Sequence, residues 1–386
     1  MQFSGDFLLI VSLCHLALVG LVQLRLLIGM NRIRRSDSLP EPEGALPSLS
    51  IIVAARNEER DIEAGLRSLL ALHYAPLQLI VINDRSTDRT GDIVNRLATQ
   101  DPRLAVLHLE SLPANWLGKN HALQRGAEMA TGEFVLFTDA DVVFQPSALA
   151  AAVAYARDQS IDHLAALPAV SMPTLLLESF ATVFSGLFLS YFRPWRASHP
   201  KSPAHIGIGA FNLVRRAAYE QVGRHEPIRM RPDDDLKLGK LMKTAGFRQE
   251  LIVAASGVRV PWYATVKEVI IGLEKNTLAG VDYRPTILFG ACVAILVVYF
   301  WPFVAMLVVP GLARWPYVAA VLILLGSAAK TAHDGGGRPW CVIWYPLTLV
   351  LFVYIVARNT LLTYWRGGIR WRDHHYPLSE LRDNKI

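Results

Sequence analysis

Apolar residues along the chain fall into long runs near its two ends and short runs between them. The long runs cover residues 7–27, 286–309, 316–329 and 341–363. A membrane-spanning helix needs about 20 apolar residues. We therefore predict a transmembrane anchor over residues 7–29 and a membrane region of about three segments over residues 286–363. The middle segment of that region is short for a full crossing.

The first apolar run has the flanking charges of an anchor that is retained. Arg32, Arg34 and Arg35 follow it, whereas a signal peptide carries its positive charge before the apolar run and a small-residue cleavage site after it. Basic residues favour the cytoplasmic side of a membrane. We expect an integral protein of the inner or plasma membrane, with the chain after the anchor in the cytoplasm.

The last stretch of the chain, residues 364–386, forms a basic tail that conflicts with this orientation. Four full crossings would place its five basic residues outside the cell, against the usual preference. Two explanations remain open from the sequence: the middle apolar segment is re-entrant, or the charge preference fails here. The five residues are Arg366, Arg370, Arg372, Arg382 and Lys385.

Residues 46–283 lack such long runs and have the size of a soluble domain. Short apolar strands are predicted at residues 49–55, 77–82, 104–109 and 133–138, and helices at residues 57–72, 90–99 and 119–130. Strands that alternate with helices favour an α/β fold with a mainly parallel, Rossmann-like sheet covered on both faces. Ligands bind beyond the carboxyl ends of the strands in such sheets.

Composition adds two exclusions. The chain is 52% hydrophobic and carries a net charge of +6, but its basic residues cluster beside membrane segments, so the charge does not require nucleic acid as a partner. Cys14, Cys292 and Cys341 all lie in or at the edge of apolar segments. Neither a disulfide framework nor a zinc cluster is therefore indicated.

Two carboxylates close the strand at residues 133–138. Asp139 and Asp141 would repel each other at the end of so apolar a strand, and a divalent cation would relieve that repulsion. Mg²⁺ or Mn²⁺ suits a site with one or two carboxylates whose remaining ligands are water and phosphate oxygens. The alternative is a solvated loop with incidental acids, because a pair of acids one residue apart also recurs by chance.

Three more polar residues stand near the predicted strand ends or helix starts. Lys119 follows Gly118 at the start of a helix, a setting that suits a diphosphate, although a solvent-exposed lysine is the plainer interpretation. Asp84 closes the second strand, where a turn or helix-capping role is the alternative. Glu58 follows the first strand and faces the same predicted cleft.

An acidic triplet precedes a later helix. Asp233, Asp234 and Asp235 are ordinary partners for a helix N-terminus, but three adjacent acids also repel one another. A carboxylate in such a cluster is a candidate for a raised pKa and a general-base role.

These features, taken in order, resemble the family-2 inverting glycosyltransferases of GT-A fold. The resemblance covers residues 46–263 and rests on five segments: ARNE at 55–58, NDRSTDRT at 83–90, GKNHAL at 118–123, TDAD at 138–141 and GAFNLVRR at 209–216. It implies that Asp139 and Asp141 hold the metal, and that Glu58, Asp84, Lys119 and Asp139 bind a nucleotide diphosphate sugar. Alignment through Gly246 makes Asp235 the catalytic base, with Asp234 as the alternative.

The chain departs from the family pattern in two places. Processive members carry a QxxRW motif, whereas this chain has Gly272-Leu273-Glu274-Lys275-Asn276 near that position. The difference counts against a polymerase that threads a growing polysaccharide. Asp233 extends the usual acidic pair to a triplet, which leaves the register of the base open between Asp235 and Asp234.

The C-terminal membrane pattern is similar to that of members that glycosylate hopanoids, carotenoids or sphingolipids. We therefore expect transfer of a sugar to a hydroxyl of a membrane lipid, with inversion at the anomeric carbon. Residues 172–196 are apolar and aromatic and form either plain core or a helix in the bilayer interface. The alternatives are a processive polysaccharide synthase and a non-catalytic lipid-binding or scaffold protein.

Overall fold

The computed structural model describes residues 5–371 and 374–386, which form two compact units. The sheet unit contains Ile33–Val170, Phe192–Pro261 and Ser379–Ile386, and the helical unit contains Met1–Arg32, Ser171–Tyr191 and Trp262–Leu378. This division differs from the expected single stretch over 46–283, because residues 171–191 and 262–283 join the helical unit and the last eight residues join the sheet unit.

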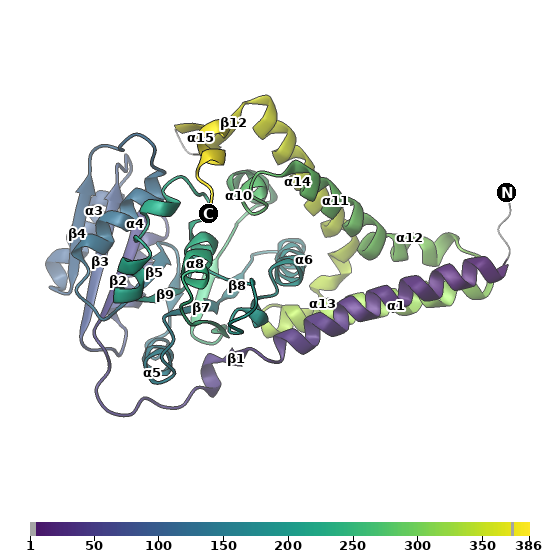
Figure 1. The fold of residues 1–386 in the computed structure, drawn as a ribbon, viewed down its shortest axis with the longest axis horizontal. Coiled ribbons are helices and arrows are strands. Elements are labelled where there is room, and N and C mark those ends of the chain that lie inside the picture. Colours follow the sequence, from purple (N-terminus) through teal and green to yellow (C-terminus); the bar gives the residue numbers. More distant parts are fainter. Residues whose placement is uncertain (1–4, 372–373) are drawn as a thin grey trace. The chain divides into compact units, whose positions relative to one another are not determined.

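An eight-stranded sheet, in the order β1-β10-β7-β9-β5-β2-β3-β4, forms the centre of the sheet unit (Figure 1). Every neighbouring pair is parallel except those of β9, which runs antiparallel to both β5 and β7. The predicted α/β class with a mainly parallel sheet is confirmed. The strands are β1 (Arg34–Arg35), β2 (Leu49–Ala55), β3 (Leu77–Asp84), β4 (Leu104–Leu109), β5 (Phe134–Asp139), β7 (His163–Leu167), β9 (Asn212–Arg215) and β10 (Gln249–Val253).

Alternate side chains of each central strand enter two different cores, because successive residues of a strand point to opposite faces. Ile51 of β2 packs in a cluster with Leu66 of α2, whereas Ile52 packs in a second cluster with Leu123 of α4. Both faces of the sheet are therefore covered. The covering helices are α2 (Ile62–Leu70), α3 (Thr90–Gln100) and α5 (Ala150–Asp158) in the first cluster, and α4 (Gly118–Met129), α7 (Arg216–Gln221) and α8 (Asp234–Thr244) in the second.

Some element boundaries differ from the predicted ones. The helix predicted over residues 57–72 begins only at Ile62. Asn57 has a left-handed φ of 54°, and its side-chain oxygen accepts from Thr87 N–H at 2.8 Å, so the segment before the helix is a loop. Arg34 and Arg35, interpreted as membrane-flanking charges, form the edge strand β1 beside Ile252 and Val253.

Small elements complete the sheet unit. Three short strands form a second sheet in the order β6-β11-β8: β6 (Val143–Phe144), β11 (Val258–Pro261) and β8 (Ala169–Ser171). The turns η1 (Ser36–Ser38), η2 (Pro194–Arg196) and η3 (Glu226–Ile228) are single 3₁₀ turns.

Five helical segments in the described residues are long and apolar enough to cross a membrane: Gly5–Met30, Leu175–Arg196, Pro285–Val308, Gly311–Asp334 and Pro339–Trp365. The middle segment of the C-terminal region is longer than hydropathy predicted. It continues beyond residue 329 to Asp334, and Lys330 and Asp334 form an i,i+4 ion pair at 2.7 Å near its end. It therefore has the length of a full crossing.

The helical unit contains α1 (Gly5–Met30), α6 (Leu175–Phe192), α11 (Pro285–Ala294), α12 (Trp301–Val308), α13 (Arg314–Asp334) and α14 (Tyr345–Trp365). Helices α1 and α13 run side by side, and His15 meets the Tyr317 ring at 5.5 Å (Figure 1). A π-helical stretch, Ile295–Phe300, joins α11 to α12 immediately before Pro302. Proline has no N–H for the helical ladder, which explains this local widening.

Shorter elements complete the helical unit: α9 (Val266–Gly272), α10 (Glu274–Ala279), the 3₁₀ turns η5 (Gly311–Ala313) and η6 (Pro339–Trp344), the hairpin β12 (Gly368–Trp371) and β13 (His374–Pro377), and the first residue of α15 (Leu378–Asp383).

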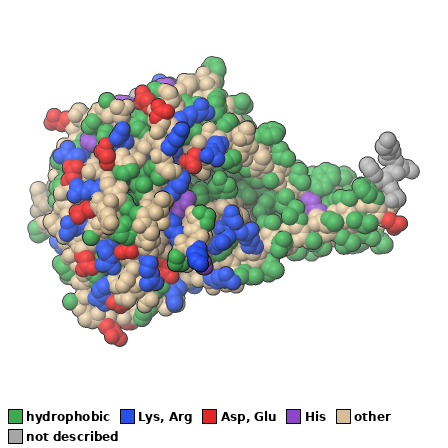
Figure 2. Space-filling view, in the orientation of Figure 1, with side chains coloured by type: hydrophobic (Ala, Val, Ile, Leu, Met, Phe, Trp, Pro, Cys, Tyr) green, Lys and Arg blue, Asp and Glu red, His purple; other side chains and the backbone are tan. Residues whose placement is uncertain are grey.

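The surfaces of the two units have different characters (Figure 2). Apolar side chains dominate the long helices, where Leu21, Phe289 and Leu322 are among the exposed residues. Acidic and basic side chains are interspersed over the sheet unit. Exposed apolar bands on long helices are typical of a membrane-facing surface.

Candidate functional site

Lys119 joins two acidic segments that lie far apart in the sequence. It stands on the first turn of α4, and its ammonium lies 2.9 Å from Asp139 Oδ1 and 3.5 Å from Asp234 Oδ1. Asp139 is the last residue of β5, and Asp234 is the first residue of α8. The strand-end acids and the acidic triplet therefore meet at one cation.

The meeting point is a pocket in the sheet unit. Its lining contains Lys119, Leu123, Phe137, Thr138, Asp139, Gly209, Asn212, His225, Asp234 and Asp235. A Cβ atom on Gly209 would lie 2.7 Å from Asp139 Oδ2 and 3.6 Å from Asp235 Oδ2. The missing side chain thus leaves room for both carboxylates on the same side of the pocket.

The charge of Lys119 is fixed by its surroundings. Burial alone would lower the pKa of its ammonium, but three nearby carboxylates outweigh burial and hold that pKa above its usual value. The lysine therefore stays protonated across the physiological range. It supplies a permanent positive charge at the start of a helix, where an anion also meets unpaired backbone N–H groups.

Asp141 is the candidate metal ligand that fits best. Burial, followed by the charges of Asp139 and Glu58, raises the pKa of its carboxyl group to about 7. Burial disfavours the charged form of this carboxyl group, and the neighbouring acids add repulsion. A divalent cation would relieve it, and hard carboxylate oxygens are the ligands that Mg²⁺ and Mn²⁺ prefer.

Residues 5–371 and 374–386 contain no group of three or more His, Cys, Asp or Glu side chains arranged to hold a metal ion. Asp139 and Asp141 remain the candidates for a cation whose other ligands are water and phosphate oxygens.

Asp84 and Glu58 lie at neighbouring strand ends outside the pocket lining. Asp84 is 3% exposed and receives two hydrogen bonds from Arg85, at 2.7 and 2.9 Å. Its Oδ2 would lie 2.5 Å from a Cβ atom on Gly118, so it is adjacent to the start of α4. The backbone N–H of Glu58 donates to Thr90 Oγ1 at 2.8 Å. The negative charge of Glu58 contributes to the raised pKa of Asp141.

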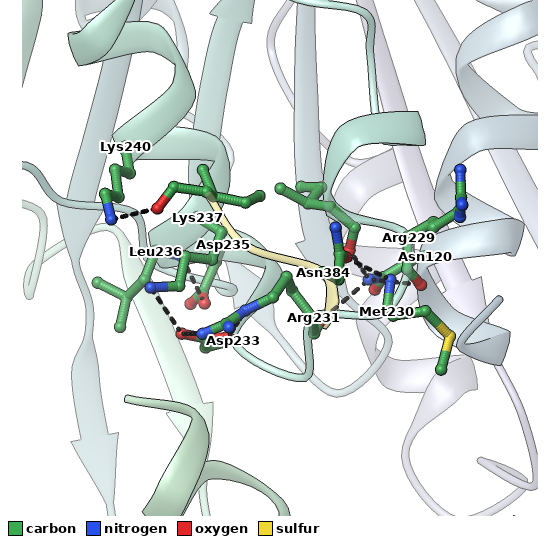
Figure 3. A network of polar contacts seen from close by, with 12 residues as sticks. Asn120, Arg229, Met230, Arg231, Asp233, Asp235, Leu236, Lys237, Lys240 and Asn384 are labelled. Atoms are coloured by element: carbon green, nitrogen blue, oxygen red, sulfur yellow. Dashed lines mark hydrogen bonds and ion pairs between the residues drawn. The ribbon is translucent and has the colours of Figure 1, made fainter. Parts of the chain in front are cut away.

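The three acids of the triplet have three different environments. Asp233 is 5% exposed and accepts two hydrogen bonds from the buried Arg231, at 2.9 and 3.0 Å (Figure 3). Asp234 faces Lys119, as described above. Asp235 Oδ1 accepts a hydrogen bond from Leu236 N–H at 2.8 Å. Asp233 is thus a structural member of a buried ion pair.

Asp235 has the properties expected of a proton acceptor. Burial, followed by the charge of Asp234, raises the pKa of its carboxyl group to about 7, although Lys119 opposes the shift. A carboxylate with a pKa near neutrality both exists in its basic form and binds a proton appreciably.

Several site residues escaped the sequence reasoning. Arg231 is 2% exposed and neutralises Asp233, but an arginine two residues before an acid carries no distinctive signal. His225 lines the pocket, and burial lowers its pKa to about 3, so it is neutral. Asn384 reaches the loop before the triplet from the far end of the chain. Neither the burial of His225 nor the contact of Asn384 has a local signal in the sequence.

The different environments predict opposite effects on stability. Asp233→Asn should lower the free energy of unfolding by about 3–5 kcal/mol, because it removes the carboxylate charge that faces the buried Arg231 and Lys237. Asp235→Asn should not destabilise the chain. Chemical denaturation of the full chain in detergent with a metal chelator would measure both effects.

The effect of Asp235→Asn should depend on pH. The pKa of Asp235 is about 7 in the folded chain and about 3.9 in an unfolded one, so ionisation costs stability as pH rises through that window and costs it fully above pH 7. Asparagine removes this cost and should stabilise the chain more at pH 8 than at pH 5. The opposite pH trend, or an Asp233→Asn chain as stable as the original, would contradict the assignment.

The middle of the chain matches a known protein family. Residues 50–223 match the family described as Glycosyl transferase family 2. This range contains Lys119, Asp139 and Asp141 but ends before the acidic triplet.

Curated relatives match over part of their length. The chain is 36% identical over 98 residues to "Probable glycosyltransferase YdaM" of Bacillus subtilis (strain 168), which is 25% of this chain and 23% of that protein. It is 27% identical over 180 residues to "4,4'-diaponeurosporenoate glycosyltransferase" of Staphylococcus aureus (strain bovine RF122 / ET3-1), which is 46% of this chain and 47% of that protein. The matches thus span from a quarter to about half of these relatives.

A solved structure shares the fold. The mannosyltransferase PcManGT from Pyrobaculum calidifontis, in complex with GDP-Man and Mn²⁺, aligns with a TM-score of 0.52 at 18% identity, over 92% of this chain and all of that one (100%). At this identity the similarity concerns the fold alone. Residues 50–223 therefore match a glycosyltransferase family 2 domain, and the chain has a GT-A-like α/β fold.

Proposed function

We propose that the chain is an inverting glycosyltransferase that moves a sugar from a nucleotide diphosphate sugar to a hydroxyl of a membrane lipid. The observation that carries the proposal is the pair of ionic contacts of Lys119 with Asp139, at the end of β5, and Asp234, on α8, in a pocket that Asp235 also lines. A transfer reaction needs a site for the leaving diphosphate beside a group that accepts a proton.

The donor side consists of Lys119, Asp139 and Asp141. The ammonium of Lys119 and the start of α4 favour the negative charge of a diphosphate. Asp141, supported by Asp139, would hold Mg²⁺ or Mn²⁺, which supplies charge neutralisation to the departing diphosphate. Glu58 and Asp84 complete the donor side at neighbouring strand ends. The Mn²⁺ in the complex of the mannosyltransferase of similar fold supports this cofactor class.

The acceptor side consists of Asp235, with Asp234 held towards Lys119. The Asp235 carboxylate takes the proton from the acceptor hydroxyl while the hydroxyl oxygen forms its bond to the anomeric carbon. The bond from that carbon to the diphosphate oxygen breaks on the opposite face, and the configuration inverts. Asp233 is not a candidate for the base, since Arg231 already occupies both its oxygens.

Two observations support a lipid acceptor. Five helical segments of the described chain have the length and composition of membrane spans. One relative is named 4,4'-diaponeurosporenoate glycosyltransferase. A hopanoid, carotenoid or sphingolipid headgroup is the acceptor class that we propose. The lack of a QxxRW motif argues against the processive alternative, and the perturbed pKa values of Asp141 and Asp235 argue against a non-catalytic scaffold.

Sheet topology restricts which helices cross the membrane. Strand β9 follows α6 in the chain but pairs with β5 and β7, which precede it. A single crossing by α6 would place partners of one sheet on opposite sides of the bilayer. We therefore propose that α6 enters and leaves on the same side, in agreement with an interfacial helix.

The same reasoning applies to the C-terminal segments. Residues 379–386 belong to the sheet unit, so the number of crossings between residues 262 and 378 is even. We propose that the anchor and two of the three C-terminal segments cross, that the third does not, and that the sheet unit and the basic tail share the cytoplasmic side. This arrangement satisfies the preference of basic residues for that side.

Labelling with a membrane-impermeant maleimide tests this topology. In a chain without its own cysteines, Glu110→Cys, Lys201→Cys and Lys385→Cys place exposed thiols before α6, after α6 and in the tail. All three should react only after the cells are opened, whereas Asp6→Cys should react in intact cells. Labelling of Lys385→Cys or Lys201→Cys from outside would contradict the proposed topology.

A comparison of acceptors tests the proposed function. One headgroup would be offered with and without its lipid tail, at matched bulk concentration, to the enzyme in liposomes with a panel of nucleotide sugars. The lipid form should react faster, because each buried CH₂ gains about 0.8 kcal/mol and raises the acceptor concentration at the membrane. Mass spectrometry of the product should show a single added sugar. Equal rates would refute the lipid acceptor, and a polymeric product would favour a synthase.

A further inference from the structure

The last residues of the chain return to the sheet unit and bind the loop that precedes the acidic triplet. Asn384 uses both ends of its side-chain amide: Oδ1 accepts from Met230 N–H at 2.9 Å, and Nδ2 donates to the carbonyl of Pro227 at 2.7 Å (Figure 3). Leu381, three residues earlier, is fully buried at 0% exposure. Residues 379–386, the tail segment, are thus packed and hydrogen-bonded.

The tail segment also reaches the helix that carries the acidic residues. The Lys240 ammonium donates to the backbone oxygen of Ile386 at 2.5 Å. Ile386 packs against the hydrophobic cluster beneath α8. Lys240 lies five residues after Asp235 on the same helix. The tail segment therefore contacts both the loop before the triplet and the body of the helix after it.

Residues at the start of α4, next to Lys119, also bind this loop. Asn120, the neighbour of Lys119 on α4, donates its amide to the carbonyls of Ile228 and Arg231 at 2.8 and 2.9 Å. The N–H of Leu117 donates to the Arg229 carbonyl at 2.9 Å. The loop is thus held between Asn120 and Asn384, and its Met230 N–H is bonded by the tail.

A continuous set of contacts leads from this loop to the acidic pair. Arg231 ends the loop and binds both carboxylate oxygens of Asp233. The Asp233 carbonyl accepts from Lys237 N–H at 3.0 Å, which starts the first turn of α8. Asp234 and Asp235 lie on that turn. A displaced loop would therefore move the two carboxylates relative to Lys119 and Asp139.

We propose that the tail segment is a positioning element for the acidic pair and that Asn384 is its principal positioning residue. This inference rests on the proposed glycosyl transfer. Asn384 touches neither donor nor acceptor and acts through the loop at residues 227–231. A reacting oxygen and its base must be placed to within a fraction of an ångström, so a small loop shift lowers the rate of transfer without releasing the donor.

The experiment compares Asn384→Ala with Lys385→Ala in the full chain, reconstituted in liposomes. Lys385 is the exposed neighbour of Asn384 and serves as the matched control. Asn384→Ala should lower kcat at least about tenfold while the dissociation constant of a nucleoside diphosphate with Mn²⁺ changes less than about twofold. Lys385→Ala should leave both unchanged. A chain that ends at Asp383 should behave like Asn384→Ala.

Hydrogen exchange supplies a readout that does not need activity. Peptides that cover residues 228–236 should exchange faster in Asn384→Ala, whereas peptides over β2 should exchange at the original rate. If the enzyme with the original sequence transfers no sugar to any acceptor, the proposed function fails. The hydrogen-exchange comparison still tests whether the tail segment orders residues 228–236. Unchanged exchange at residues 228–236, unchanged kcat in an active enzyme, or equal loss of donor binding and of kcat would overturn the inference.

Discussion

The site depends on the ion pairs of Lys119. Three carboxylates raise the pKa of its ammonium, and without that charge they would repel one another across a partly buried pocket. Lys119 contacts Asp139 at 2.9 Å and Asp234 at 3.5 Å, so one side chain connects the end of β5 to the start of α8. In the proposed reaction, a cation between the two acidic groups would let a leaving diphosphate and a proton acceptor share one pocket.

The sheet makes this contact possible. Strand β9 lies antiparallel between β5 and β7, and the chain after it leads through α7 to α8. Gly209, three residues before β9, leaves space for both Asp139 and Asp235. Two acids that are 96 positions apart in the sequence (235 minus 139) thereby both lie next to a single glycine.

Sequence patterns predicted the elements whose signals are local. The apolar strands β2, β3, β4 and β5 and the helices between them follow from periodicity. The parallel direction of these strands follows from their alternation with helices. The insertion of β9 between β5 and β7 could not be predicted in this way, because strand order depends on packing between distant segments. The edge strand β1 was missed because Arg34 and Arg35 have no apolar pattern.

The candidate site likewise combines features with a local sequence signal and features that depend on distant contacts. Motif order indicated Lys119, Asp139 and the triplet, and the structure brings these residues together. The resemblance favoured Asp235 as the base and left Asp234 as the alternative, since the environments of adjacent acids cannot be read from the sequence. The buried Arg231 separates Asp233 from the other two. The role of residues 379–386 depends on a contact between Asn384 and Met230 across 154 positions, which no local pattern records.

The central claim is that Asp141 holds the metal and Asp235 acts as the base. One paired measurement tests this claim most directly. Transfer rate and metal-dependent binding of a nucleoside diphosphate would be measured for Asp235→Asn and Asp141→Ala in the full chain. Asp235→Asn should abolish transfer and keep binding within about twofold, because the base is needed for the acceptor proton and not for the nucleotide. Asp141→Ala should weaken binding and remove its dependence on metal. Substantial transfer by Asp235→Asn, or unchanged metal-dependent binding by Asp141→Ala, would contradict the account.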